Sequence, residues 1–284
     1  MILGMFFNSV KKACFLAESK AIKYSRKLAR IRDAGEVTSK VLQKLVGFLV
    51  YAAWVMPFGR PFISQISNFI NAKHIHKKIR FDPPALVACD IWLFLLKKNH
   101  GLSYDFILGK LPRAKDEWFV DASKYGYGGV CGNSFFKLSH HELLDSLVPA
   151  LKNKFVDIFI AYRELLAVLL AFQVFAKISP KSYIRINSDN SNVVSWVNKG
   201  RCSKKHGVLI LSAIEAFKFK YGLKVKAFYV KSSHNTSADA LSRGYIPHWL
   251  KMRGVTRNVV GKELSQLLTT PLPFWKVKNT FSPF

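Results

Sequence analysis

The sequence predicts an α/β protein in which residues 113–245 form a mixed five-stranded sheet flanked by helices, after a mainly helical segment, residues 1–112. Two observations predict this class. Apolar residues recur at helical spacing before Pro112, whereas after it short strand-like runs and helical stretches follow in the order β-β-β-α-β-α-α-β-α. Half of the 284 residues are hydrophobic, which excludes wholesale disorder.

Residues 1–112 are expected to contain four helices. Asp82 followed by two prolines is the clearest start, because Asp is a favoured N-cap and proline suits the first turn. Ser19 and Thr38 are candidate caps for the first two helices, and Pro57 should end the second. The expected ranges are about 19–32, 38–56, 61–72 and 82–98.

Residues 113–245 are predicted to form five short strands and four helices, with glycines at the turns. The first strand, 117–123, is followed by strands at 126–131, 134–138, 182–186 and 224–230. A strongly apolar helix is expected at 161–176, and further helices near 191–198, 206–221 and 237–242.

The chain is strongly basic along its whole length. Lysine and arginine number 44 against 17 acidic residues, which gives a net charge of +27. A polyanionic partner would relieve this self-repulsion, so nucleic acid is the first candidate partner and an anionic membrane surface the second. The longest apolar run, 45–58, is shorter than the ~20 residues of a spanning helix, so no membrane insertion is expected. The four cysteines lack zinc-ligand spacing and are expected to be free thiols.

Four carboxylates stand where a solvated surface charge is not the natural explanation. They lie inside an apolar strand, at the start of an apolar helix, at the end of a strand and at the head of a short helix: Asp121, Glu164, Asp189 and Asp239. Gathered at one sheet edge they would repel each other, and hard divalent cations would remove that cost. Two such ions can activate a water and stabilise the leaving oxygen of a phosphodiester. Each residue also has a structural explanation, as a turn former, a partner of the preceding arginine, or a helix cap.

Four stretches resemble, in order, the successive motifs of a retroelement ribonuclease H domain. They are residues 117–130 (EWFVDASKYGYGGV), 163–168 (RELLAV), 186–197 (INSDNSNVVSWV) and 234–243 (HNTSADALSR). The Asp189-Asn190 pair and the spacing of Asn235 to Asp239 resemble the DIRS-like and gypsy-like branches.

The upstream part resembles the thumb and connection region of a reverse transcriptase. Ile2-Leu3-Gly4 looks like a strand near the primer grip, and residues 42–62 (LQKLVGFLVYAAWVMPFGRPF) look like the thumb/connection stretch. No YxDD-type turn occurs, so the resemblance implies a C-terminal piece of a larger polyprotein, or a degenerate copy, whose polymerase domain lies upstream. Residues 246–284 are expected to be a C-terminal extension, with prolines that suggest a linker.

The resemblance implies a metal-dependent endonuclease that hydrolyses the RNA strand of RNA–DNA hybrids. Asp121, Glu164, Asp189 and Asp239 take the positions of the four acids that bind two Mg²⁺ or Mn²⁺ ions. Many members carry a histidine about ten residues before the last acid, where this sequence has Tyr229. His234 lies five residues before Asp239, and is either a proton-transfer residue or a solvated loop histidine.

Substrate contacts are expected mainly with phosphates and 2′-hydroxyl groups. Ser123 and Asn190 lie beside candidate acids and could reach the nucleic-acid backbone. A basic loop (NKGRCSKKHG) follows the third acid and offers four further candidates: Lys199, Arg201, Lys204 and Lys205. A solvated basic loop is the alternative explanation for these four residues.

Two other functions remain open from the sequence. One is a catalytically inactive, nucleic-acid-binding remnant of a retroelement, and the other is a basic protein of a membrane surface. Hydrolysis of a hybrid distinguishes the enzyme from the remnant, and binding to anionic liposomes without hybrid binding would favour the membrane-surface protein.

Overall fold

The computed structural model describes residues 4–71, 76–108, 114–180, 182–258, 264, 265 and 268. These residues belong to two compact units, one within 4–108 and one within 114–268. Some of the predictions fall outside the described residues. They concern the boundary at 112/113, the residues Ile2 and Leu3, and the prolines of the expected linker, Pro271, Pro273 and Pro283. No helix among the residues that are described has both the length and the apolar character needed to cross a bilayer.

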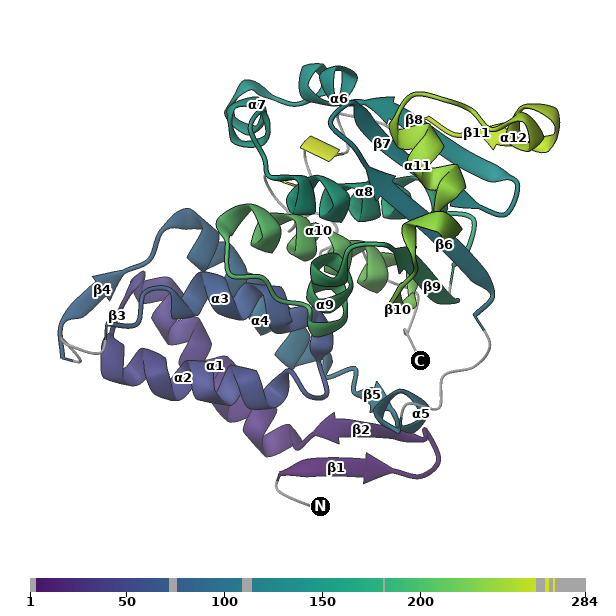
Figure 1. The fold of residues 1–284 in the computed structure, drawn as a ribbon. Helices are drawn as coiled ribbons and strands as arrows, with labels where there is room; N and C mark the ends of the chain where they lie inside the picture. Colours follow the sequence, from purple (N-terminus) through teal and green to yellow (C-terminus); the bar gives the residue numbers. More distant parts are fainter. Residues whose placement is uncertain are drawn as a thin grey trace. The chain divides into compact units, whose positions relative to one another are not determined.

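The first unit is mainly helical, as predicted. Its helices are α1 (Glu18–Ala34), α2 (Ser39–Ala52), α3 (Arg60–Ser67), α4 (Pro83–Lys98) and the short α5 (Tyr104–Ile107), with a 3-10 turn η1 (Pro57–Gly59) (Figure 1). Two small antiparallel sheets complete it, β1 (Met5–Asn8) with β2 (Ala13–Leu16) and β5 (Leu102–Ser103), and β3 (Glu36–Thr38) with β4 (Lys78–Arg80).

Capping residues explain the two ends of α4 more fully than they explain the start of α2. Asp82 Oδ1 accepts a hydrogen bond of 2.9 Å from the backbone N–H of Ala85, so the predicted cap of α4 is confirmed. At the other end Asn99 adopts a left-handed conformation with φ 43°, which closes the helix. Thr38 stands at the N-cap of α2 as predicted, but its side chain makes no capping hydrogen bond.

The second unit is built on a mixed sheet with strand order β10-β9-β6-β7-β8-β11. The strands are β6 (Asp116–Ala122), β7 (Gly126–Cys131), β8 (Ser134–Ser139), β9 (Tyr183–Ser188), β10 (Lys224–Tyr229) and β11 (Val255–Thr256). β6, β7 and β8 pair antiparallel, whereas β9 is parallel to both β6 and β10. An α/β fold with a mixed sheet is therefore present. The nine predicted elements occur in the predicted order, and two helices that the sequence did not predict lie between β8 and the apolar helix.

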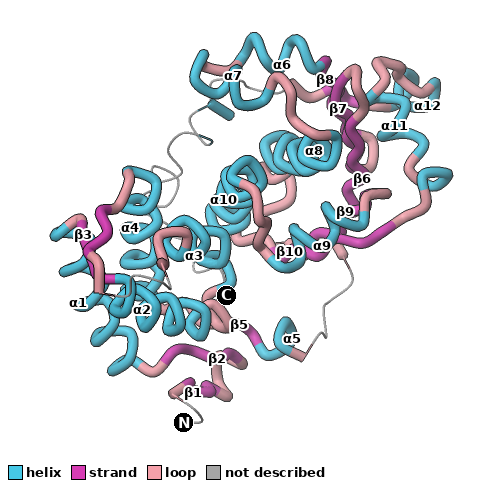
Figure 2. Tube along the Cα trace, turned by 60° about the vertical axis from the view of Figure 1, so that its left-hand side comes forward, coloured by secondary structure: helices cyan, strands magenta, loops and turns pink. Residues whose placement is uncertain are grey.

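Helices cover both faces of this sheet. They are α6 (His140–Ser146), α7 (Pro149–Phe155), α8 (Ile160–Phe175), α9 (Ser191–Lys199), α10 (Lys205–Tyr221), α11 (Thr236–Ser242) and α12 (His248–Arg253), with a 3-10 turn η2 (Ser232–His234) before α11. Figures 1 and 2 show α8 and α10 side by side.

The alternation of side chains along β6 shows which helices cover each face of the sheet. Trp118 and Val120 are buried in the large core with α8 and α10, whereas Phe119 packs with the smaller cluster of Leu241 and Leu250 from α11 and α12. Successive side chains of a strand point to opposite faces, so α8 and α11 lie on opposite sides of the sheet.

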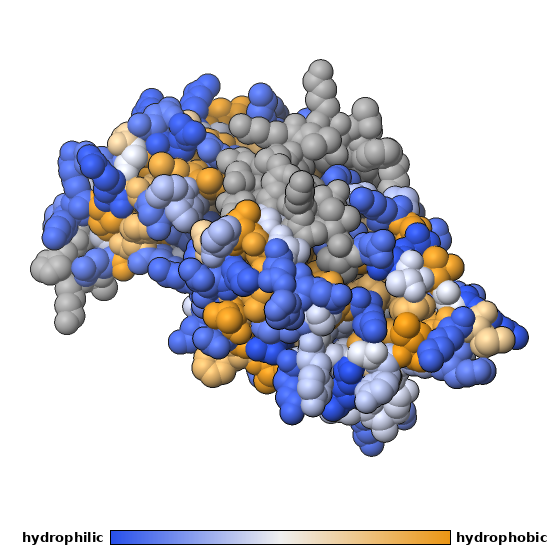
Figure 3. Space-filling model, turned by 90° about the horizontal axis from the view of Figure 1, so that it is seen from above, coloured by the Kyte–Doolittle hydropathy of each residue, from blue (hydrophilic) through white to orange (hydrophobic). Residues whose placement is uncertain are grey.

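Figure 3 shows one side of the molecular surface. Among the described residues on it, hydrophilic side chains form most of the surface and hydrophobic ones lie in groups between them.

The sheet has six strands rather than the five that the sequence predicts. β11 pairs in parallel with β8, with Val255 opposite Ser134. Leu250 of α12 is buried on the face of the sheet that α11 covers, in the same cluster as Leu241. Part of the expected extension, 246–258, therefore folds onto the sheet of the second unit. The strand was missed because two paired residues carry no alternating pattern to detect.

Gly128 on β7 lets α11 approach the sheet closely. A Cβ there would lie 2.5 Å from the carbonyl oxygen of Ala238 and 2.6 Å from Cβ of Leu241. We expect Gly128→Ala to lower the free energy of unfolding by about 1–3 kcal/mol, because α11 has to move away from β7. Urea unfolding measures this.

A matched control is Gly47→Ala in the middle of α2, where a Cβ would meet nothing within 4 Å. It should raise the free energy of unfolding by roughly 0.5–1 kcal/mol, because alanine favours helix over glycine. Equal, small effects of both substitutions would contradict the close packing of α11 on β7.

Candidate active site

The register of two parallel strands brings Asp121 and Asp189 to one edge of the sheet. β6 and β9 are parallel, with Phe119 opposite Asn187, so two residues further along Asp121 lies level with Asp189. Asp121 belongs to β6, whereas Asp189 follows the last residue of β9. Carboxyl ends of parallel strands are where open α/β sheets bind their ligands.

Asp121 is a buried carboxylate, with 7% of its surface exposed. Its Oδ2 accepts a hydrogen bond of 2.6 Å from the hydroxyl of Ser242. Burial raises the pKa of Asp121 to about 6, and the charges of Asp189 and Asp239 act in the same direction, while the Ser242 hydrogen bond opposes them. The two neighbouring carboxylates are thus close enough to act on Asp121.

Glu164 comes from the N-terminal part of α8 and meets the same group. Its Oε1 accepts a hydrogen bond of 3.1 Å from Asn190 Nδ2, and its Oε2 is buried without a hydrogen-bond partner among the described residues. Burial raises the pKa of Glu164 to about 7; the Asn190 hydrogen bond opposes this, and the charges of Asp189 and Asp121 add to it. Such a buried oxygen is costly unless a proton, a hydrogen-bond donor or a cation meets it.

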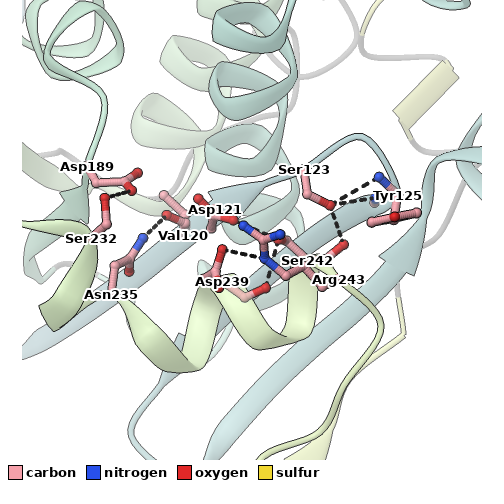
Figure 4. A network of polar contacts seen from close by, with 11 residues as sticks. Val120, Asp121, Ser123, Tyr125, Asp189, Ser232, Asn235, Asp239, Ser242 and Arg243 are labelled. Atoms are coloured by element: carbon pink, nitrogen blue, oxygen red, sulfur yellow. Dashed lines mark hydrogen bonds and ion pairs between the residues drawn. The ribbon is translucent and has the colours of Figure 1, made fainter.

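The other two carboxylates are held by neighbours on the loop and helix after β10. Asp189 Oδ2 accepts a hydrogen bond of 2.7 Å from Ser232 Oγ, and Asp239 Oδ1 pairs with Arg243 Nε at 2.8 Å. Figure 4 shows Asp189, Asp121 and Asp239 along one stretch of the sheet edge and α11. The strand register places Asp121 level with Asp189, and the Asn190 amide links Glu164 to the residue after Asp189. Ser242 links Asp121 to α11, which carries Asp239. The structure therefore brings the four carboxylates predicted from the sequence to one end of the sheet.

The donor set suits a hard divalent cation in its chemistry. All four residues offer carboxylate oxygens, the ligands that Mg²⁺ and Mn²⁺ prefer, and the unpartnered oxygen of Glu164 fits such an ion. As the side chains stand, no three acidic, histidine or cysteine side chains of the described part of the chain are close enough to hold one ion together. Oxygens of Asp121, Asp189 and Asp239 are engaged instead by Ser242, Ser232 and Arg243.

Four residues of this network were not predicted as site residues from the sequence. They are Ser232, Asn235, Ser242 and Arg243. Asn235 is buried, and its Nδ2 donates to the carbonyl oxygen of Val120, which ties the start of α11 to β6 beside Asp121. Asn235, Ser242 and Arg243 lie within the HNTSADALSR motif, which could have drawn attention to them, whereas nothing in the sequence distinguishes Ser232.

The structure uses Ser123 and Asn190 locally. Ser123 Oγ donates to the carbonyl oxygen of Ser242 at 2.8 Å and accepts from the backbone N–H of Tyr125. Asn190 Oδ1 accepts from the backbone N–H groups of Asn192 and Val193, so Asn190 caps α9 while its amide reaches Glu164. Both side chains therefore hold parts of the site in place: Ser123 holds the end of α11, and Asn190 holds Glu164.

The remaining predicted residues lie apart from this hydrogen-bonded network. His234 is exposed in η2, where it lines a hollow of about 450 Å³ together with Glu117 and Trp249. None of the four carboxylates is among the described residues that line this hollow. The basic residues at the end of α9 and the start of α10 are exposed: Lys199, Arg201, Lys204 and Lys205.

Ser242→Ala should destabilise the protein, because it leaves a buried carboxylate without its hydrogen bond. We expect the free energy of unfolding at pH 8 to fall by about 1.5–3 kcal/mol, the range for hydrogen bonds to charged groups. Ser146→Ala is the matched control, since Ser146 Oγ donates to a backbone carbonyl oxygen, that of Leu143, at an exposed position. Equal effects of the two changes in urea unfolding would contradict the role of Ser242.

Compared with known proteins, the sequence matches no family model and no curated protein.

Proposed function

We propose that the second unit is a retroelement ribonuclease H domain, an endonuclease that hydrolyses the RNA strand of RNA–DNA hybrids with two Mg²⁺ or Mn²⁺ ions. The observation that carries the proposal is that the register of β6 and β9 and the hydrogen bond from Asn190 to Glu164 bring three acids from separate motifs to one end of the sheet: Asp121, Glu164 and Asp189. The order of strands and helices and the net charge of +27 give further support.

In this proposal Asp121, Glu164, Asp189 and Asp239 hold the ions. Bound ions would supply an activated water and stabilise the leaving oxygen of the phosphodiester. Ser242, Ser232 and Asn190 hold the carboxylates of Asp121, Asp189 and Glu164 in place. Hydrolysis would leave 5′-phosphate and 3′-hydroxyl ends, as the resemblance implies.

For the first unit we propose the thumb/connection part of a reverse transcriptase, whose polymerase domain would be a partner encoded upstream. The helices α1 to α4 and the resemblance of residues 42–62 support this.

A second candidate is the inactive nucleic-acid-binding remnant. It is favoured by the ion pair of Asp239 with Arg243, and by the absence of any three acidic, histidine or cysteine side chains in the described part of the chain that could hold one ion together. Both candidates bind nucleic acid, so turnover separates them.

The test is digestion of an end-labelled RNA–DNA hybrid by the full chain in Mg²⁺ and, separately, in Mn²⁺. We expect internal cuts in the RNA strand and none in double-stranded DNA of the same sequence. A folded protein that binds the hybrid without cutting it in either metal would overturn the enzyme and favour the remnant.

A further inference from the structure

The turn between β6 and β7 is joined firmly to the end of α11, beside the candidate active site. Ser123 Oγ donates to the carbonyl oxygen of Ser242, and Lys137 Nζ on β8 donates to the carbonyl oxygen of Gly244 at 3.1 Å. Figure 4 shows Ser123, Tyr125, Ser242 and Arg243 together next to Asp121 and Asp239. The turn and the helix end therefore form one continuous surface.

Hydrogen bonds from two further elements hold the backbone of the turn. Arg163 of α8 donates to the carbonyl oxygen of Lys124 at 3.2 Å, and the backbone N–H of His140 donates to that of Tyr125 at 2.8 Å. Such a surface binds a ligand with little loss of conformational entropy, because its backbone is already ordered.

Three cations are exposed on this surface. The side chain of Arg243 is 52% exposed, and Lys124 and Lys137 are exposed as well. The ammonium group of Lys124 lies 4.9 Å from the ring centre of Tyr125, which orients it. Arg243 also reaches the carboxylates, since Asp239 and Asp121 both raise its pKa. Positive charge therefore lies directly next to the site where a phosphodiester would react.

We propose that Lys124, Lys137 and Arg243 form a phosphate-binding platform that holds the backbone of a nucleic acid next to the four carboxylates. This inference rests on the proposed function for its substrate class. It differs from the expectation drawn from the sequence, which placed the basic contacts in the loop of Lys199 to Lys205. The platform is connected to the carboxylates by hydrogen bonds, which is why we prefer it.

The experiment measures hybrid affinity by fluorescence anisotropy across a series of KCl concentrations, in EDTA, with the full chain. The platform variant is Lys124→Gln/Lys137→Gln, and the matched control is Lys199→Gln/Lys205→Gln, which removes the same charge from the basic loop. Arg243 is left intact because it pairs with Asp239.

We expect the platform variant to reduce the magnitude of the negative slope of log K against log[salt] by about 1.4–1.8, at ~0.7–0.9 per phosphate contact. The control should leave this slope unchanged. An unchanged slope in the platform variant, or an equal fall in both variants, would overturn the platform. Loss of anionic-vesicle binding with unchanged hybrid binding would overturn it in favour of a membrane contact.

These outcomes are separate from that of the proposed function. If the wild type does not cut the hybrid but the platform variant still reduces the magnitude of the slope, the nuclease fails and the platform stands. If the wild type cuts and the slopes do not differ, the platform alone fails. Thermal unfolding of both variants shows whether either has lost its fold.

Discussion

Asp121→Asn is expected to lower the rate of RNA-strand hydrolysis at saturating Mg²⁺ by at least ~10³-fold, because a metal ion contributes several kcal/mol to the transition state. Affinity for the hybrid should stay within about twofold, since phosphate contacts dominate it. Stability at pH 8 should rise by on the order of 1–3 kcal/mol, because a buried carboxylate with a raised pKa is replaced by a neutral amide. Single-turnover cleavage, anisotropy and urea unfolding measure the three quantities.

Asp116→Asn is the matched control, because Asp116 begins the same strand at its other end, where it accepts a hydrogen bond from Ser179. It should leave the cleavage rate within about twofold. If Asp121→Asn cuts as fast as Asp116→Asn, Asp121 has no part in the reaction. If Asp121→Asn unfolds, its carboxylate is a structural group and the assignment of the site fails.

The contribution of Asp121 and Glu164 to the stability of the metal-free protein is expected to fall as the pH rises from about 4 to about 7. Folding raises the pKa of Asp121 from 3.8 to about 6 and that of Glu164 from 4.5 to about 7. Within this window these two groups bind more protons in the folded state than in the unfolded state, so their contribution to the free energy of unfolding decreases with pH. The extra stability is complete below the ordinary pKa values and is lost once both folded-state values are passed. The combined effect should be on the order of 2–5 kcal/mol.

Urea unfolding in EDTA at pH 5 and pH 8 checks this, with Asp121→Asn/Glu164→Gln as the variant that should lose this component. The control is Asp116→Asn/Glu117→Gln, which changes two carboxylates of β6 and should keep it. Mg²⁺ should restore stability at pH 8 by about 2.7 kcal/mol at a hundredfold excess over its dissociation constant. The same pH dependence in the site variant and the wild type would refute the coupling of these carboxylates.

Several features could be predicted because their causes lie within a few residues. The cap of α4 at Asp82 and its end at Asn99 depend on side-chain and backbone geometry within one turn. The apolar run of α8 likewise predicted a helix buried against a sheet, and ten of its residues from Leu165 to Phe175 are hydrophobic and buried. The four carboxylates were found because each interrupts such a local pattern.

Other features depend on residues far apart and left no local trace. Asp121 and Ser242, which hydrogen bond directly, are separated by 121 positions, and Asp189 and Ser232 by 43. The pairing of β11 with β8, the hydrogen bond of Ser123 to Ser242 and that of Asn190 to Glu164 belong to the same group. Serines and arginines occur throughout any surface, so their partners follow only from strand register and helix packing.

The amino-acid sequence by itself determined the order of strands and helices, the strong positive charge and the four acidic positions, because hydrophobic periodicity, capping and composition act locally. Only the tertiary structure decided that these acids act on each other's pKa, which of their oxygens is left without a partner, and which cations lie beside them. Those properties depend on burial and on distances across the sheet, and burial exists only once the chain has folded.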